Sequence, residues 1–245
     1  MCFGSKLRWN LLGLVALLAL LPLAVIPLPA QGQENEQCFS ETGFCVSGRI
    51  LEYWQQNGGL PVFGFPITPQ REETIGDWTG QAQWFERNRL ELHPENEAPY
   101  DVLLGRLGAP VVERDGISTP REEPREGCTY FEQTGYNVCG DFLAYWSSQG
   151  LNLDGQPGFT FEESLGLFGL PLTGEVEATL EDGMTRTIQW FERARFERHP
   201  ENEPPFDVLL ALLGVAEIGT PVPEEPAPEE PAPEEPAPEE PAPEE

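Results

Sequence analysis

Basic residues are scarce in this sequence. It contains 14 lysines and arginines against 42 aspartates and glutamates, which gives a formal net charge of −28 at pH 7. A body this acidic repels phosphate backbones and anionic lipid headgroups, so nucleic acids and anionic membranes are poor partners. The acidity favours solubility outside the cell.

Histidine is almost absent, and the two histidines are His93 and His199. Each stands in the motif His-Pro-Glu-Asn-Glu, with no second histidine or cysteine at the spacing of metal ligands. The favoured interpretation is a histidine held by hydrogen bonds at a strand end; a metal or acid–base site is the alternative. The sequence has no Ser, Cys or His constellation for a nucleophile and no glycine-rich phosphate loop. We therefore expect no metal, no cofactor and no enzymatic activity.

Long apolar runs are confined to the first 30 residues. Lys6 and Arg8 form a basic start, residues 11–26 are almost wholly apolar, and Ala30 precedes a polar stretch. This order predicts a secretory signal peptide at 1–30, which is removed from the mature protein. An uncleaved membrane anchor is the alternative, although the run is short for a spanning helix of about 20 residues.

Aromatic residues are absent from the last 25 residues, which hold ten glutamates in a Pro-Glu repeat. Such a segment cannot bury enough apolar surface to offset the entropy that is lost on ordering. We expect residues 215–245 to be a disordered, stiff and anionic spacer.

The remainder of the chain contains a repetition. Residues 83–108 and 189–214 are identical at 19 of 26 positions, and the similarity extends toward the N-terminus of each stretch. The expected boundaries are a first copy at 38–108, a linker at 109–127 and a second copy at 128–214, with an insertion within 151–166. The sequence leaves open whether the two copies pack together or lie as separate beads on the linker.

Four of the five cysteines fall within the copies: Cys38, Cys45, Cys128 and Cys139. An even set in an oxidising compartment indicates disulfides. The two pairs occupy different positions but share one midpoint, which a hairpin-like fold-back permits because side chains on a strand repeat every second residue. This predicts the bridges Cys38–Cys45 and Cys128–Cys139.

Each copy begins with the pattern of a short helix. In the first copy an apolar stripe runs from Val46 to Trp54, and Gly58 follows as the residue after the C-cap. The second copy repeats the stripe and has Gly150 at the corresponding place. A Phe-Gly-x-Pro loop comes next in both copies.

The second half of each copy alternates apolar and polar residues around a tight turn. This predicts β-hairpins at 81–93 and 187–199. The stretches at 99–108 and 205–214 have proline at one end and glycine at the other, which predicts a closing helix. The fold class is therefore α+β: a tandem repeat of a small unit of short helix, loop, β-hairpin and short helix, in two copies, followed by the disordered tail.

This pattern resembles the LGFP repeat of actinobacterial and related cell-envelope proteins. The matching residues of the first copy are Thr42, Gly43, Val46, Gly48, Ile50, Trp54, Gly58, Gly59, Phe63, Gly64, Phe65, Pro66 and Phe85. Those of the second copy are Thr134, Gly135, Val138, Gly140, Phe142, Trp146, Gly150, Phe168, Gly169, Leu170, Pro171 and Phe191. Phenylalanine replaces the first leucine of the motif, and the unit is longer than the family's. The resemblance implies binding to, or tethering at, the cell wall.

The tryptophans in the hairpins are the main candidates for a binding site. Trp84 and Phe85 are adjacent on a strand and point to opposite faces. Phe85 matches the family's core position, which leaves Trp84 on the other face with Glu86. An exposed tryptophan beside a carboxylate suits a sugar, so we expect ligand-binding pairs at Trp84 and Glu86 and at Trp190 and Glu192. The alternative is that a helix or the other copy covers this face.

The copies also share carboxylates and arginines. A glycosidase pair is one interpretation of the carboxylates, but acids are common in this chain and ion pairs explain them. The carboxylates are Glu86, Glu91, Glu95 and Asp101, with Glu192, Glu197, Glu201 and Asp207. For the arginines we favour internal pairing with glutamate over contact with a wall polymer. They are Arg87, Arg89, Arg193 and Arg195.

These observations predict a secreted, envelope-associated and non-enzymatic binding module that recognises cell-wall polysaccharide or peptidoglycan through both copies. The first alternative is a structural or adhesive module that binds an envelope protein. A carboxylate-dependent hydrolase is the second. No membrane insertion is expected after cleavage, and the ligand is not identified by the sequence.

Overall fold

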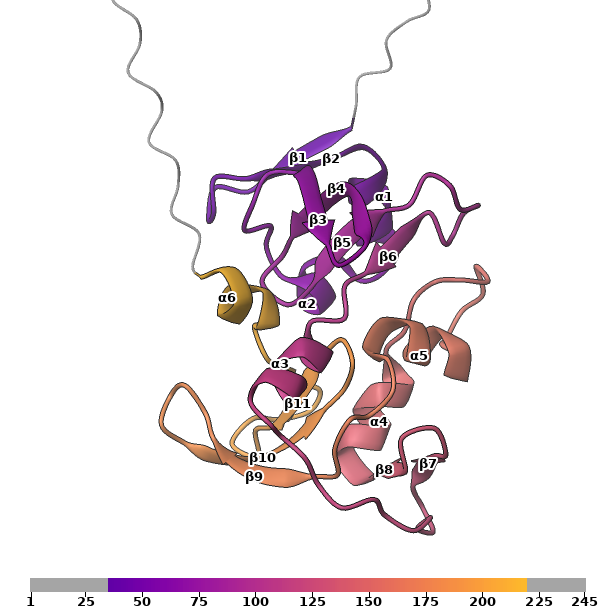
Figure 1. The fold of residues 1–245 in the computed structure, drawn as a ribbon, viewed down its shortest axis with the longest axis vertical. Coiled ribbons are helices and arrows are strands. Elements are labelled where there is room, and N and C mark those ends of the chain that lie inside the picture. The colour runs from indigo at the N-terminus through magenta and orange to yellow at the C-terminus, as the bar shows by residue number, and fades with distance from the viewer. Residues whose placement is uncertain (1–34, 220–245) are drawn as a thin grey trace, which may run out of the picture. The chain divides into compact units, whose positions relative to one another are not determined.

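A computed structural model describes residues 35–219, so the expected signal peptide and residues 220–245 of the expected tail lie outside the described residues. The expectation of disorder is wrong for residues 215–218, which belong to helix α6 (Leu213–Ile218). The fold is mixed α+β, as expected, with short helices and small antiparallel sheets. The first elements are β1 (Glu36–Cys38), β2 (Cys45–Ser47), α1 (Gly48–Gln56), α2 (Gly59–Phe63), β3 (Arg71–Ile75), β4 (Trp78–Trp84), β5 (Arg89–Leu92), β6 (Val102–Leu104) and α3 (Gly108–Arg114). Then follow β7 (Thr129–Phe131), β8 (Tyr136–Val138), α4 (Gly140–Ser148), α5 (Phe161–Phe168), β9 (Val176–Thr179), β10 (Thr185–Trp190), β11 (Arg195–Arg198), β12 (Val208–Leu210) and α6 (Leu213–Ile218). The order strand, strand, helix, helix, four strands, helix therefore occurs twice along the chain (Figure 1).

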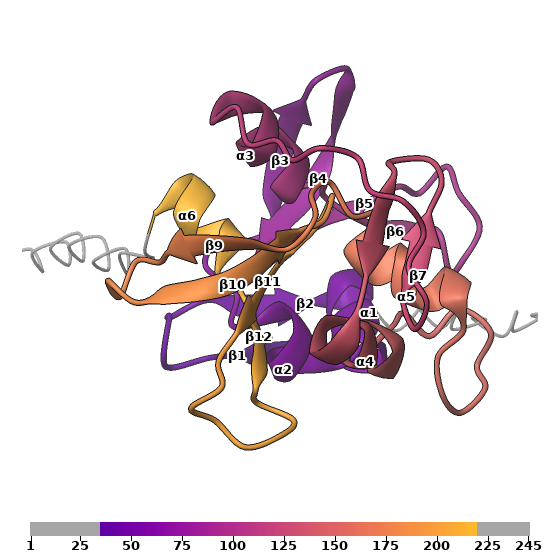
Figure 2. The same cartoon turned by 90° about the horizontal axis from the view of Figure 1, so that it is seen from below.

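Each expected hairpin is the centre of a larger sheet. The order is β3-β4-β5-β6 in one four-stranded sheet and β12-β11-β10-β9 in the other, with all neighbours antiparallel. Figure 2 shows β9, β10 and β11 side by side. None of the helices in residues 35–219 has the length and apolar character needed to cross a membrane.

The closing helices expected at 99–108 and 205–214 are wrong. Val102–Leu104 is strand β6 and pairs with β5, so that Leu104 lies opposite Leu90 and Val102 opposite Leu92. Apolar cross-strand pairs of this kind stabilise a sheet. The pairing also gives hydrogen-bond partners to the backbone N–H and C=O groups at the open edge of the hairpin. The helices α3 and α6 begin later, at Gly108 and Leu213.

The apolar stripe at the start of the first copy is buried, but not all of it is helical. Ile50 and Trp54 lie on α1 and are 0% and 6% exposed, whereas Val46 belongs to strand β2. Gly58 adopts the expected left-handed backbone after the cap residue Asn57, with φ of 102°. The expectation for Gly150 is wrong, because there the chain leaves α4 in an extended conformation.

The disulfide predictions are confirmed. Cys38–Cys45 joins two directly opposed residues of the β1–β2 hairpin, and Cys128–Cys139 lies at the open end of the β7–β8 hairpin. The shared midpoint of the two pairs therefore corresponds to the shared turn of the two hairpins.

Residues 38–108 and 128–214, which are named the first and second copy from their sequences, are in contact through an exchange of helices. The backbone N–H of Gly108, at the start of α3, donates to the carbonyl of Glu192 at 3.0 Å, and that of Gly214 in α6 donates to the carbonyl of Glu86 at 2.9 Å. One apolar cluster also contains core residues of both copies. Part of the segment expected as a linker is thus α3, and its N-terminus lies on the second copy (Figure 1).

The insertion in the second copy is held by one buried glutamate. Glu163, on α5, is 2% exposed and accepts hydrogen bonds from the backbone N–H groups of Leu153 at 2.8 Å and Thr160 at 2.8 Å. The backbone donors, with Thr160 first, outweigh burial and lower the pKa of the Glu163 carboxyl. A carboxylate with a lowered pKa stabilises the fold at pH values above its unfolded pKa and loses this effect as pH falls.

We predict that Glu163→Gln lowers the melting temperature by roughly 5 °C at neutral pH, because one of the two acceptor oxygens is replaced by an amide donor. The difference from wild type should shrink as pH falls below the ordinary glutamate pKa of about 4.3, because the unfolded state then binds a proton that the folded carboxylate resists. Thermal unfolding across pH measures both effects. Glu162→Gln, on the exposed side of the same helical turn, is the matched control; equal behaviour of the two variants would contradict the prediction.

Candidate functional site

One face of the first four-stranded sheet carries a row of polar side chains. Trp84 lies opposite Arg89, and Ala82 opposite Glu91, so these residues share a face of the sheet. The other face belongs to the apolar core, where Leu90 and Phe85 are fully buried. Trp84 and Phe85 therefore do point to opposite faces, as the sequence predicts.

The polar residues of this face are paired with one another. The Arg89 guanidinium lies 4.8 Å from the centre of the Trp84 ring, and its Nε and Nη2 donate to Glu91 Oε1 at 2.8 and 2.6 Å. Glu91 Oε2 is 3.5 Å from His93 Nε2, and His93 Nδ1 is 2.9 Å from Glu95. A stacked arginine that donates two hydrogen bonds to one carboxylate oxygen fixes the orientation of the carboxylate.

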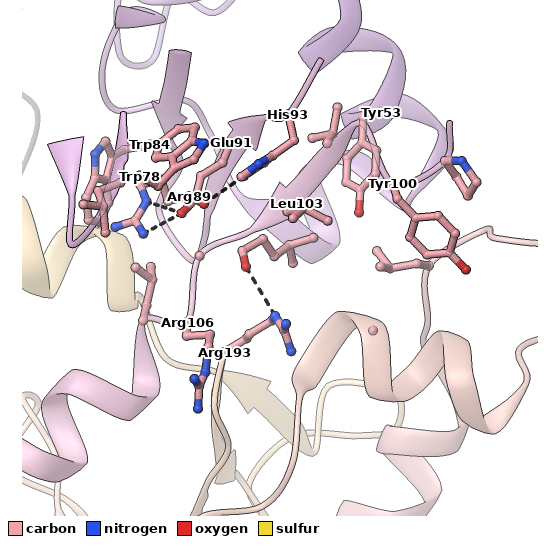
Figure 3. A pocket seen from close by; sticks show the side chains of 18 of the residues that line it. Tyr53, Trp78, Trp84, Arg89, Glu91, His93, Tyr100, Leu103, Arg106 and Arg193 are labelled. Carbon is pink, nitrogen blue, oxygen red and sulfur yellow. Dashed lines mark hydrogen bonds and ion pairs between the residues drawn. The ribbon is translucent and has the colours of Figure 1, made fainter. Parts of the chain in front are cut away.

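This row forms one wall of a cavity of about 690 Å³, which we name the first cavity. Figure 3 shows Trp78, Trp84 and Arg89 at one side of it, Tyr53 and Tyr100 at the opposite side, and Glu91 and His93 between them. The second copy also contributes to the lining, through Leu151 and Leu153 of the insertion and through Arg193.

Arg193 enters the first cavity from the second copy (Figure 3). Its Nε donates to the carbonyl of Leu104 at 3.3 Å, and burial lowers the pKa of its guanidinium. Burial also raises the pKa of the Tyr53 phenol well above its usual range. The phenol is therefore neutral at physiological pH, and it adds a polar group to an otherwise apolar part of the lining.

The second copy carries the same row of side chains. The Arg195 guanidinium lies 5.3 Å from the Trp190 ring and donates to Glu197 Oε1 through Nε at 2.9 Å and Nη2 at 2.6 Å. Glu197 Oε2 is 3.3 Å from His199 Nε2. These four residues line a second cavity, also of about 690 Å³, to which α3 of the first copy adds Val111 and Arg114.

The two cavities differ in the surroundings of the tryptophan. Trp84 Nε1 donates to both oxygens of Glu73 at 2.9 Å, whereas the register of the second sheet places Ala178 at that position. Trp190 Nε1 consequently has no hydrogen-bond partner among the described residues. In the second cavity Glu181 contacts Arg195 instead, at 3.1 Å.

The expectation that Trp84 and Trp190 are exposed platforms is wrong, because they are only 5% and 4% exposed. Both belong to an apolar cluster with Leu107 and Leu213, so helix-bearing segments cover this face, as in the alternative interpretation. Each indole still forms part of a cavity wall. Ligand binding by these tryptophans stays a prediction.

Glu86 and Glu192 do not lie with the tryptophans. Glu86 Oε2 accepts a hydrogen bond from the backbone N–H of Phe65 at 3.1 Å, and Glu192 Oε2 accepts one from Leu170 at 3.2 Å. Neither carboxylate lines the first or the second cavity. In both copies these contacts attach the Phe-Gly-x-Pro loop to the hairpin turn.

The remaining shared charges are mostly paired internally, as favoured from the sequence. Arg89 and Arg195 bind glutamates within the sheet, and each histidine lies after a strand end beside two carboxylates. Asp101 binds Arg49 through two hydrogen bonds of 2.6 and 2.9 Å.

Sequence reasoning missed Trp78 and Tyr100 as cavity residues. Trp78 is unique to the first copy, where the second has Met184, so a search for shared residues passes over it. Tyr100 is 56% exposed and follows the His-Pro-Glu-Asn-Glu motif. The only sequence signal for it is that both copies have an aromatic residue at this place, which is Phe206 in the second copy.

No protein-family model matches this chain, and no curated protein matches it either.

Proposed function

We propose that this protein is a secreted, non-catalytic binding protein with two related ligand cavities, and that it recognises cell-wall polysaccharide or peptidoglycan. One observation carries the proposal: the same four side chains, Trp, Arg, Glu and His, line two cavities of about 690 Å³ each. Ligand pockets typically have volumes of about 300–1,000 Å³ and combine apolar walls with a few placed polar groups.

Binding is favoured over catalysis by the pairing of the polar groups. One oxygen of Glu91 accepts both hydrogen bonds from the Arg89 guanidinium, and the other oxygen faces His93. Glu197 is held in the same way by Arg195 and His199. A glycosidase needs a carboxyl group with an oxygen that faces the scissile glycosidic bond. Both oxygens of Glu91 and of Glu197 instead contact an arginine or a histidine of the protein. Carboxylate oxygens have further lone pairs, so they can still accept hydrogen bonds from ligand hydroxyl groups.

A glycan fits the mixture of aromatic and polar groups in the lining. Aromatic rings cover the apolar face of a sugar ring, and the carboxylates, arginines and histidines bond to its hydroxyl and amide groups. The strong negative charge of the chain disfavours anionic polymers.

The resemblance to LGFP repeats supports the same function and, within this proposal, a location at the cell envelope. In this proposal residues 38–108 and 128–214 are two copies of one unit, and the Pro-Glu tail is a spacer. Two disulfides suit an oxidising compartment outside the cell. Two weak sites on one chain increase the overall affinity for a polymer without a strong single site.

The test is sedimentation of the full chain with insoluble cell-wall material. The double variant Tyr100→Ala with Leu212→Ala removes one exposed lining residue from each cavity. We expect it to bind the wall material at least about tenfold more weakly than wild type, since each residue contributes contact area at a cavity mouth.

The matched control is Phe206→Ala with Ile218→Ala, two exposed apolar residues that line neither cavity. It should bind as wild type does. If neither the wild type nor the control sediments with the wall material, wall recognition is refuted and an envelope protein is favoured as the partner. Release of soluble sugar products during the incubation would instead favour the hydrolase.

A further inference from the structure

Trp78 is shared by two neighbouring cavities. It lines the first cavity, and it also lines a separate hollow of about 440 Å³, which we name the Trp78 hollow. The hollow lies along the β3–β4 side of the first sheet, where Glu72 and Gln81 line it. Among residues 35–219, no other residue lines both spaces.

The Trp78 ring is held in place on its strand. It lies over Gly80, where a Cβ atom would collide with the indole, and it stacks on His93 with ring centres 4.9 Å apart and an interplanar angle of 27°. The side chain is only half-buried. A ring that is fixed before binding loses little conformational entropy when a ligand covers it.

Neighbouring residues of the chain line the two spaces. His93 lines the first cavity, and the carboxylate of Glu95, 2.9 Å from its Nδ1, lines the hollow. Likewise Tyr100 lines the cavity, and the next residue, Asp101, lines the hollow. The two spaces therefore adjoin across Trp78 and the His-Pro-Glu-Asn-Glu segment.

The hollow is rich in hydrogen-bond acceptors. Its own backbone N–H and His93 lower the pKa of the Glu95 carboxyl, and Arg49 lowers that of Asp101, so both are ionised at neutral pH. Within the described part of the chain, Arg49 is the one cation of the lining, and its guanidinium is bound to Asp101. Glu72 adds a further exposed carboxylate. This excess of carboxylates over cations repels an anionic polymer and favours a ligand with hydroxyl groups.

We infer that the first copy binds an unbranched, uncharged polysaccharide chain, with successive sugar rings in the first cavity and in the Trp78 hollow and with Trp78 between them. The inference rests on the proposed function and adds that the ligand is uncharged and long enough to reach both spaces. The second copy has Met184 and Arg186 at the positions of Trp78 and Gly80, so it presents no such ring and takes a shorter stretch of chain.

The test is calorimetric titration of the full chain with chitobiose and with chitohexaose, uncharged unbranched probes of different length. We expect chitohexaose to bind wild type at least about tenfold more tightly than chitobiose, because only the longer chain reaches both spaces. Trp78→Ala should lose this preference for length. Met184→Ala, the matched change in the second copy, should keep it.

Two further variants separate folding from binding. Trp78→Phe keeps an aromatic ring and should retain most of the length preference, and Glu72→Gln, at an exposed position, should weaken only chitohexaose. Equal affinity for both lengths, or tighter binding of an oligolysine or a polygalacturonate than of chitohexaose, would overturn the inference. If wild type sediments with wall material in those cases, the proposed function still stands; if it sediments with none, both fail.

Discussion

Replacing Gly214 with alanine should destabilise the protein by about 3 kcal/mol, the upper end of the usual cost of overpacking. A Cβ atom at this position would collide with the carbonyl oxygen of Phe85 and lie 3.2 Å from that of Glu86. Both atoms belong to the backbone and cannot rotate away. The substitution therefore separates α6 from the first copy and breaks the hydrogen bond from the Gly214 N–H to the Glu86 carbonyl.

Gly108→Ala should have a similar effect from the opposite side, because a Cβ atom there would collide with the carbonyl oxygen of Phe191. Denaturant unfolding measures both free energies. Gly174→Ala is the control, since the nearest atom to its Cβ is the flexible end of the Glu122 side chain at 3.0 Å. Wild-type stability of Gly108→Ala and Gly214→Ala would show that the copies do not exchange helices in solution.

Gln83→Leu should cost about 2–6 kcal/mol of unfolding free energy, because two backbone carbonyls lose a buried donor and each such loss costs about 1–3 kcal/mol. The Gln83 side chain is fully buried, and its Nε2 donates to the carbonyls of Cys45 at 2.8 Å and Thr68 at 2.9 Å. These two bonds join strand β4 to the disulfide hairpin and to the segment after the Phe-Gly-x-Pro loop.

The equivalent Gln189→Leu should be as costly, since Gln189 Nε2 donates to the carbonyls of Asn137 and Thr173 at 2.8 and 2.9 Å. Gln81→Leu makes the same chemical change at an exposed position of β4 and should alter stability by less than about 0.5 kcal/mol. Chemical unfolding of the three variants decides the matter: a Gln83→Leu protein as stable as Gln81→Leu would rule out the buried role.

Local patterns predicted part of this fold well. The alternation around Arg87 and Asn88 predicts a hairpin, and the equal midpoints of the cysteine pairs predict both disulfides. These features depend on residues close in sequence, whose side-chain directions follow from the strand period alone. The prediction of helices at 99–108 and 205–214 was wrong because it ignored residues distant in sequence. In each case Val-Leu-Leu is a strand that pairs with the open edge of the hairpin.

Some features of the candidate site also follow from local sequence, whereas others depend on tertiary packing. The sequence by itself determined that Trp84 and Phe85 face opposite sides and that each side chain of the Trp, Arg, Glu and His row has a counterpart in the other copy. Only the tertiary structure decided that α3 and α6 cross to the opposite copy, that the tryptophans are covered, and that the cavities draw residues from both copies. The direction of a side chain is set by its own strand, whereas its exposure depends on which distant segment packs against that face.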